Sequence, residues 1–107
     1  MCIYEVRAIV QAKVYPQYLE WLKTEHVKEV LACPGFISAD ICVGKFGVAL
    51  ESSSIEIKVI YKLRDETALK EYLSHRAMAL REKGLQKFPG EFSAQREMWK
   101  EVFTFTA

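Results

Sequence analysis

The chain has 107 residues, half of them hydrophobic and 27% charged, and its 15 Lys and Arg against 14 Asp and Glu leave a formal net charge of +1. This length gives room for one domain with one core, which we expect over residues 1–107. The balanced charge lacks the clustered basic excess of a nucleic-acid-binding protein, and no apolar stretch approaches the roughly 20 residues of a membrane-spanning helix, so we expect neither nucleic acid nor a membrane as a partner.

The first half of the chain predicts a strand, a helix and a second strand. Residues 2–10 alternate between two faces with the period of a strand. Apolar residues then recur at helical spacing from Pro16, which suits the first turn of a helix, to Cys33-Pro34-Gly35, which ends it. A second strand is predicted at about 36–44. Its expected core-facing residues are Ile37, Ala39, Ile41 and Val43.

The second half predicts the same order of elements after a polar connection at 44–54. Residues 55–63 alternate as a third strand. Asp65 suits the N-cap of a second helix, which Gly84 is expected to end. A last strand is expected at about 92–103, where two apolar patterns compete and a bulge would reconcile them. The stripe of the second helix is Leu69, Tyr72, Leu73 and Leu80, closed by Arg81, Lys83 and Gly84.

The doubled order of strand, helix and strand predicts an α+β fold of the ferredoxin-like βαββαβ type. Right-handed crossovers place both helices on one face of a four-stranded antiparallel sheet. The opposite face of the sheet is then left open.

The open sheet face predicts a homodimer, because large aliphatic and charged side chains share it and the apolar sequence continues past the last strand. Trp21 falls off the stripe of the first helix, which indicates contact with a partner chain. The alternatives are a solvated sheet face and, for Trp21, a rim residue with its N–H in water. The candidate interface residues are Ile3, Glu5, Arg7, Trp21, Ile60, Phe103 and Phe105.

Two polar residues, His26 and Arg76, interrupt the apolar stripes of the predicted helices. One interpretation is that His26 bonds to a backbone carbonyl and Arg76 reaches the helix edge. The other is a small pocket between helices and sheet, in which Arg76 binds an anionic group and His26 moves a proton. The candidate pocket residues are Tyr18, His26, Tyr72, Arg76 and Arg96.

No motif of a cofactor or metal site is present. The sequence has no Gly-rich phosphate loop, Gly-x-Ser-x-Gly or His-Glu-x-x-His, so we predict no cofactor and no metal. Cys2, Cys33 and Cys42 lack Cys-x-x-Cys spacing and predict reduced thiols. Because the first residues also lack the pattern of a signal peptide, we expect a cytoplasmic location.

Five stretches that cover most of the chain carry a family resemblance. They are Ile3-Tyr4-Glu5-Val6, Tyr18-Leu19-x-Trp21-Leu22-x-x-x-His26-Val27, Cys33-Pro34-Gly35-Phe36, Tyr61-Lys62-Leu63-Arg64-Asp65, and Arg81-Glu82-Lys83-Gly84-Leu85 running to Phe88-Pro89-Gly90-Glu91-Phe92-Ser93-Ala94-x-Arg96. They resemble a bacterial family of small proteins known only as a domain of unknown function. The resemblance implies a ferredoxin-like fold in a dimeric α/β barrel, similar to the antibiotic-biosynthesis monooxygenases. It implies no agreed activity, so no catalytic residue is carried over.

Two features depart from the family pattern: the longer connection at 44–54, and Arg76, where the pattern has His.

From the sequence as a whole we expect an uncharacterised small cytosolic protein that forms a homodimer and binds a small ligand. The alternative is a cofactor-independent monooxygenase or isomerase acting on a small aromatic or polyketide-like substrate, an analogy of fold alone. A third class is a subunit that docks a different protein through its sheet face.

Overall fold

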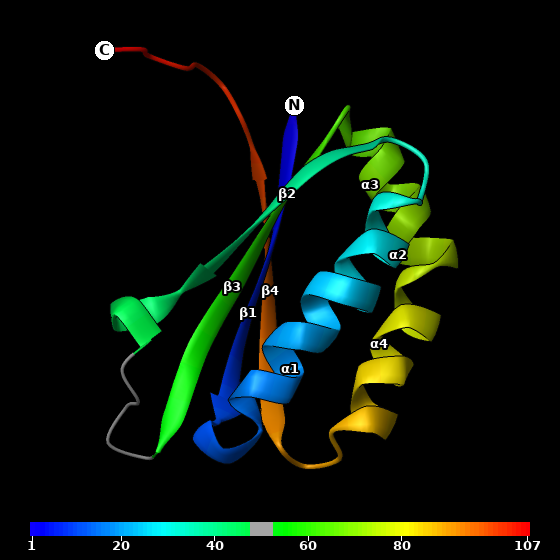
Figure 1. Ribbon diagram of the computed structural model, residues 1–107. Helices are drawn as coiled ribbons and strands as arrows, with labels where there is room; N and C mark the ends of the chain where they lie inside the picture. The colour runs from blue at the N-terminus through cyan, green and yellow to red at the C-terminus, as the bar shows by residue number, and fades with distance from the viewer. Residues whose placement is uncertain (48–52) are drawn as a thin grey trace.

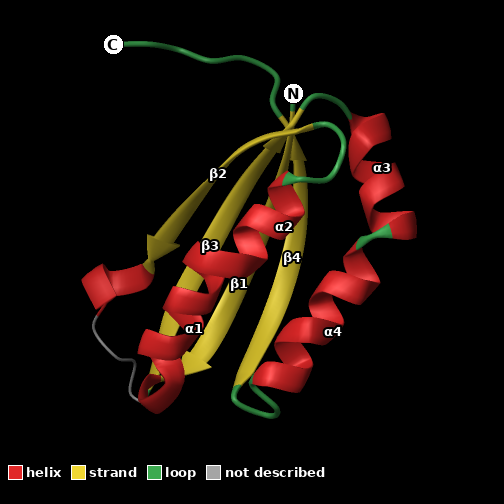
Figure 2. Cartoon of the chain, turned by 45° about the vertical axis from the view of Figure 1, so that its right-hand side comes forward, coloured by secondary structure: helices red, strands yellow, loops and turns green. Residues whose placement is uncertain are grey.

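The computed structural model describes residues 1–47 and 53–107, so 48–52, inside the predicted 44–54 connection, lie outside the described residues. Four antiparallel strands form one sheet in the order β2-β3-β1-β4, and the helices cover one of its faces (Figures 1 and 2). The ferredoxin-like βαββαβ prediction is confirmed. The elements are β1 (Cys2–Gln11), α1 (Tyr15–Trp21), α2 (Val27–Leu31), β2 (Phe36–Val43), β3 (Ser54–Leu63), α3 (Glu66–His75), α4 (Ala77–Lys87) and β4 (Phe92–Lys100).

The two central strands form the floor of the core. β1 pairs with β3 without interruption from Cys2–Leu63 to Gln11–Ser54. Every second residue of β3, from Ile55 to Leu63, is buried against the helices, as the alternation predicted. Each fully buried side chain of this kind stabilises the fold by roughly 1.5–3 kcal/mol, which fixes the register of the sheet.

The first helix is not regular. A π-helical segment, Leu22–His26, separates α1 from α2, and the N–H of Val27 donates to the carbonyl oxygen of Leu22, five residues earlier. Trp21, the last residue of α1, lies one turn after the buried Tyr18 on the sheet side, where only 6% of its surface remains exposed. The expectation that Trp21 faces a partner chain was therefore wrong, because Trp21 shares a core-facing side of the helix with Tyr18 and Leu22.

The second helix is broken at Arg76, whose backbone angles (φ −128°, ψ −35°) leave the helical region. The predicted cap is confirmed, since the carboxylate of Asp65 accepts a hydrogen bond from the N–H of Ala68 at 2.9 Å. The predicted end at Gly84 was wrong: α4 continues to Lys87 and buries Gly84. The break rotates α4, so that Arg76 is exposed and a new face points at the sheet. That face is Ala77, Arg81, Gly84 and Phe88.

The last strand has one continuous register. β4 pairs with β1 from Phe92–Val10 to Lys100–Cys2 without a bulge and ends before 103, so the bulge is not needed. Arg96 lies opposite Val6 on the helix side of the sheet, whereas Trp99 lies opposite Ile3 on the open side. The chain beyond β4 extends away from the sheet (Figure 1).

One irregularity lies in β2, where the register shifts between Phe36 and Ser38. Ile37 lies at this shift and is 52% exposed, contrary to the expected core position. Within the described residues, no helix is long and apolar enough to cross a membrane.

A candidate ligand pocket between sheet and helices

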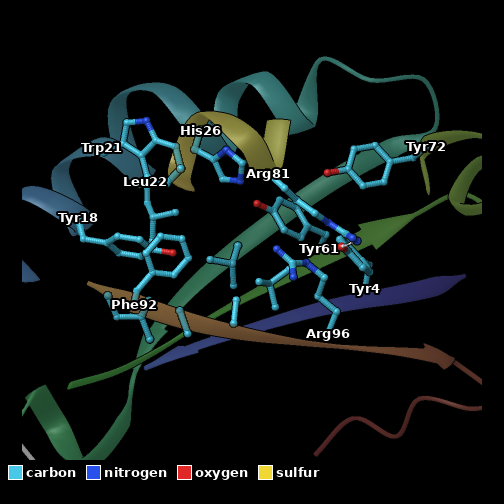
Figure 3. Close-up of a pocket in the computed structure, with 16 residues that line it drawn as sticks. Tyr4, Tyr18, Trp21, Leu22, His26, Tyr61, Tyr72, Arg81, Phe92 and Arg96 are labelled. Atoms are coloured by element: carbon cyan, nitrogen blue, oxygen red, sulfur yellow. Dashed lines mark hydrogen bonds between the residues drawn. The ribbon is translucent and has the colours of Figure 1, made fainter. Parts of the chain in front are cut away.

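A small cavity of about 40 Å³ lies between the sheet and the helices. Its floor comes from β1, β3 and β4 and its roof from α1, the π-helical segment, α3 and α4 (Figure 3). One water molecule needs about 10–15 Å³ of such space, so the cavity has room for a few waters or one small polar group. The polar side chains that line it are Tyr4, Tyr18, His26, Tyr61, Tyr72, Arg81 and Arg96.

Arg81 enters the pocket from α4 (Figure 3). Its Nη2 donates a hydrogen bond to the hydroxyl oxygen of Tyr4 at 3.0 Å, whereas its Nε is buried with no hydrogen-bond partner among the described residues. The guanidinium group is therefore held in one orientation while part of its donor capacity stays unused. No ion pair of Arg81 is found among the residues that the structure describes.

Arg96 enters from the opposite side, on β4 (Figure 3). Its positive charge acts to lower the pKa values of Tyr18 and Tyr72 and also that of His26. In the described part of the chain Arg96 too has no ion pair, and no Asp or Glu lines the cavity. The pocket is thus electropositive.

Three tyrosines of the pocket, Tyr18, Tyr61 and Tyr72, are neutral hydrogen-bonding groups at physiological pH. Burial raises the pKa of Tyr18 to about 12, against the opposing effect of Arg96. Burial also raises the pKa values of Tyr61 and Tyr72. Their hydroxyls can therefore donate as well as accept hydrogen bonds.

His26 is also uncharged at neutral pH. Burial lowers its pKa to about 4; the charges of Arg96 and Lys83 act in the same direction, whereas the carboxylate of Glu29 opposes them. Its Nδ1 is buried with no hydrogen-bond partner among the described residues. One interpretation of the sequence was that His26 bonds to a backbone carbonyl. The structure shows no such bond for Nδ1 among the described residues. A neutral imidazole with an unused nitrogen can hydrogen-bond to a ligand or accept a proton from it.

The indole of Trp21 forms part of the roof and depends on Gly84. A Cβ atom at position 84 would lie 2.9 Å from Cη2 of Trp21, closer than such contacts occur. Glycine at this helical position therefore lets the indole approach α4 closely. The indole in turn stacks on His26, with ring centroids 4.5 Å apart.

A second space of about 180 Å³ adjoins the cavity between α4 and β4. It is lined by Leu85 and Ser93 and shares Arg81, Phe92 and Arg96 with the inner pocket. The two arginines thus lie where an inner chamber meets an outer groove.

One known protein family matches almost the whole of this chain. The sequence model of a domain of unknown function, DUF4286, matches residues 1–102. The chain belongs to this family. The resemblance drawn from the sequence is confirmed, and the family brings no assigned activity with it. Among curated proteins, none matches the chain.

Solved structures share the fold of this DUF4286 chain at low sequence identity. HapK from Hahella chejuensis is 11% identical with a TM-score of 0.68, over 100% of this chain and 98% of HapK. SnoaB from Streptomyces nogalater, a cofactor-independent oxygenase, is 11% identical with a TM-score of 0.66, over 99% and 97% of the two chains. A dimeric ferredoxin-like protein from an uncultured marine organism is 16% identical with a TM-score of 0.61, over 100% of both. These likenesses establish the fold alone.

The predicted pocket residues of the DUF4286 chain are only partly brought together. His26 and Arg96 line the cavity, as do Tyr18 and Tyr72. Arg76 does not, because the helix break turns it to solvent. Arg81 lies in the pocket instead and was missed as a site residue. The signal was in the sequence, since Ala77, Arg81, Gly84 and Phe88 share one helical face at spacings of four, three and four.

The structure places the predicted interface residues in three different regions. Ile3, Glu5, Arg7 and Ile60 lie on the open sheet face, as their register with β3 and β4 requires. Trp21 is in the core of its own chain. In the tail beyond β4, Phe103 and Phe105 are 71% and 88% exposed.

Proposed function

We propose that the protein is a homodimer that binds a small organic molecule in the pocket between its sheet and helices. The observation that carries this proposal is a polar inner chamber beside the groove between α4 and β4, in which His26 Nδ1 and Arg81 Nε have no hydrogen-bond partner among the described residues. Ligand sites in proteins combine an apolar and aromatic wall with a few fixed polar groups. Here Trp21 and Phe92 belong to the wall, and His26, Arg81 and Arg96 are the polar groups beside it.

The dimer part of the proposal is supported by the open sheet face. Aliphatic side chains alternate there with ion pairs, such as Lys58 with Glu5 at 3.3 Å. Trp99 adds an aromatic side chain that is 54% exposed. A contiguous surface of this kind is typical of an interface. The same fold occurs in the dimeric ferredoxin-like protein described above.

A screen of small organic molecules by ligand-observed NMR tests the binding site. Ala94 lines both the chamber and the groove, so Ala94→Phe fills the space where they meet. We expect binders of the wild-type protein to be lost in this variant. Ala79→Phe, on the exposed side of α4, is the matched control and should bind them normally. Unchanged binding by Ala94→Phe would place the ligand elsewhere and contradict the proposal.

The second candidate function is a cofactor-independent monooxygenase or isomerase. The observation that favours it is His26, a neutral imidazole with an unused nitrogen beside the cavity. Such chemistry needs a base that takes a proton from the substrate. Oxygen uptake with a naphthol as substrate, present in wild type and His75→Gln but lost in His26→Gln, would support it. If the protein binds the same naphthol but does not turn it over, only the binding function is supported.

A further inference from the structure

We infer that the ligand is a small organic acid whose carboxylate is bound between Arg81 and Arg96. This inference rests on the proposed function, that the pocket binds a small organic molecule, and it names the class of that molecule. Both guanidinium groups line the inner chamber and the groove, so they lie at the junction through which a ligand would pass.

The charge of the pocket requires an anion. Among the described residues, every ion pair joins side chains other than Arg81 and Arg96, and the chamber has no acidic lining residue. Arg81 and Arg96 are half-buried, so part of each charge is withdrawn from water, and a charge that loses water without gaining a partner is costly. The planar guanidinium group matches a carboxylate with two parallel hydrogen bonds. The Nε of Arg81, buried without a partner, is a donor still available for such a bond.

The neutral groups of the chamber are suited to an anion as well. The hydroxyls of Tyr61 and Tyr72 stay protonated, so each has a hydrogen to donate to a carboxylate oxygen. His26 is uncharged at neutral pH and adds no negative charge. A cationic ligand would meet two positive charges here and no compensating carboxylate, so the pocket selects against it.

The sizes of the two spaces set the orientation of the ligand. The inner chamber, at about 40 Å³, has room for a small polar group such as a carboxylate, whereas the groove, at about 180 Å³, is larger. Leu85, which is 53% exposed, lines the groove together with Phe92. We therefore place the carboxylate inward and the apolar body of the acid in the groove, against these two side chains.

The test compares benzoate with benzamide, its uncharged analogue of almost the same shape, on the full-length protein. Binding is followed by titration in NMR spectra that resolve the Nε–Hε signals of Arg81 and Arg96. We expect benzoate to shift both signals and to bind at least tenfold more tightly than benzamide. Arg96→Gln should weaken benzoate binding at least tenfold, and Arg96→Lys, which keeps the charge, should weaken it less. Arg76→Gln, at an exposed position outside the pocket, is the matched control and should bind benzoate as wild type does.

Each other outcome overturns the inference in a recognisable way. If benzoate and benzamide bind equally well and Ala94→Phe abolishes the binding of both, the carboxylate site is refuted and the proposed function stands. Benzoate binding that Arg96→Gln does not weaken, in a variant that remains folded by its NMR spectrum, would also refute it. If neither compound binds and no small molecule in the wider screen does, the proposed function fails together with the inference.

Discussion

The indole of Trp21 stacks on the imidazole of His26, with ring centroids 4.5 Å apart and ring planes inclined by 20°. Residues five apart lie on different faces of a regular α-helix, so this contact depends on the π-helical segment, in which Val27 bonds back to Leu22. The stack shields one face of the imidazole from water. It thereby contributes to the burial that keeps His26 neutral.

The first prediction concerns stability at acid pH. His26 has a folded pKa of about 4 against an ordinary value of 6.5, so between these values the unfolded chain binds more protons than the folded one. The free energy of unfolding therefore falls as the pH drops from about 6.5 to about 4, by up to roughly 3 kcal/mol from this group. Urea unfolding at a series of pH values measures the slope.

Replacement of the two histidines separates this effect from the titration of carboxylates. His26→Gln should lose the part of the slope between pH 4 and 6.5. His75→Gln should keep it, because His75 is exposed and pairs with Glu71 on the surface of α3. Parallel slopes in the two variants would show that His26 is not held neutral by the fold.

The second prediction concerns Gly84. Alanine normally stabilises a helix interior by roughly 0.5–1 kcal/mol relative to glycine. At position 84 the added methyl group meets the indole of Trp21, so Gly84→Ala should instead destabilise by about 1–3 kcal/mol. Thermal and urea unfolding report the sign. In a Trp21→Phe background, which removes the contacting ring atoms, the penalty should shrink or reverse; an equal penalty in both backgrounds would rule out this contact as the cause.

The third prediction concerns the hydrogen bond from Arg81 to Tyr4. Tyr4→Phe removes the acceptor and should lower the free energy of unfolding by about 1 kcal/mol. Tyr61→Phe is the matched control, since the hydroxyl of this equally buried residue makes no hydrogen bond to the described residues. Tyr4→Phe should also broaden the Nε–Hε signal of Arg81, because the side chain loses its fixed orientation. Identical behaviour of the two variants would show that the bond does not hold Arg81.

The fourth prediction concerns the dimer. Ile60 lies on the open sheet face between Glu5 and Asp40, its partners on β1 and β2. Ile60→Lys is therefore tolerated by the single chain but places a charge in the middle of the proposed interface. Sedimentation should show a dimer dissociation constant raised by at least about tenfold, or about 1.4 kcal/mol. Met78→Lys, at an 82% exposed position on α4, should leave the dimer intact. A wild-type protein that sediments only as a monomer would end the proposal.

The fold followed from the sequence because its signals are local. Alternation at 2–10 and 55–63 marked the two central strands, and the side chain of Asp65 alone capped α3. The positions of the site residues could be predicted less well from the sequence. Arg76 was assigned from regular helical spacing, which breaks at that residue, whereas Trp21 was placed off a core-facing side that it shares with Tyr18 and Leu22.

The sequence by itself determined the order of elements, the central strands and their two faces, and the family, because hydrophobic period and capping chemistry act between near neighbours in the chain. Only the tertiary structure decided which polar side chains share the pocket. Packing of the large indole of Trp21 against Gly84 accompanies the π-helical segment, and the break at Arg76 turns Arg81 toward Tyr4. Contacts of this kind join residues far apart in the sequence, so periodicity within one helix does not contain them.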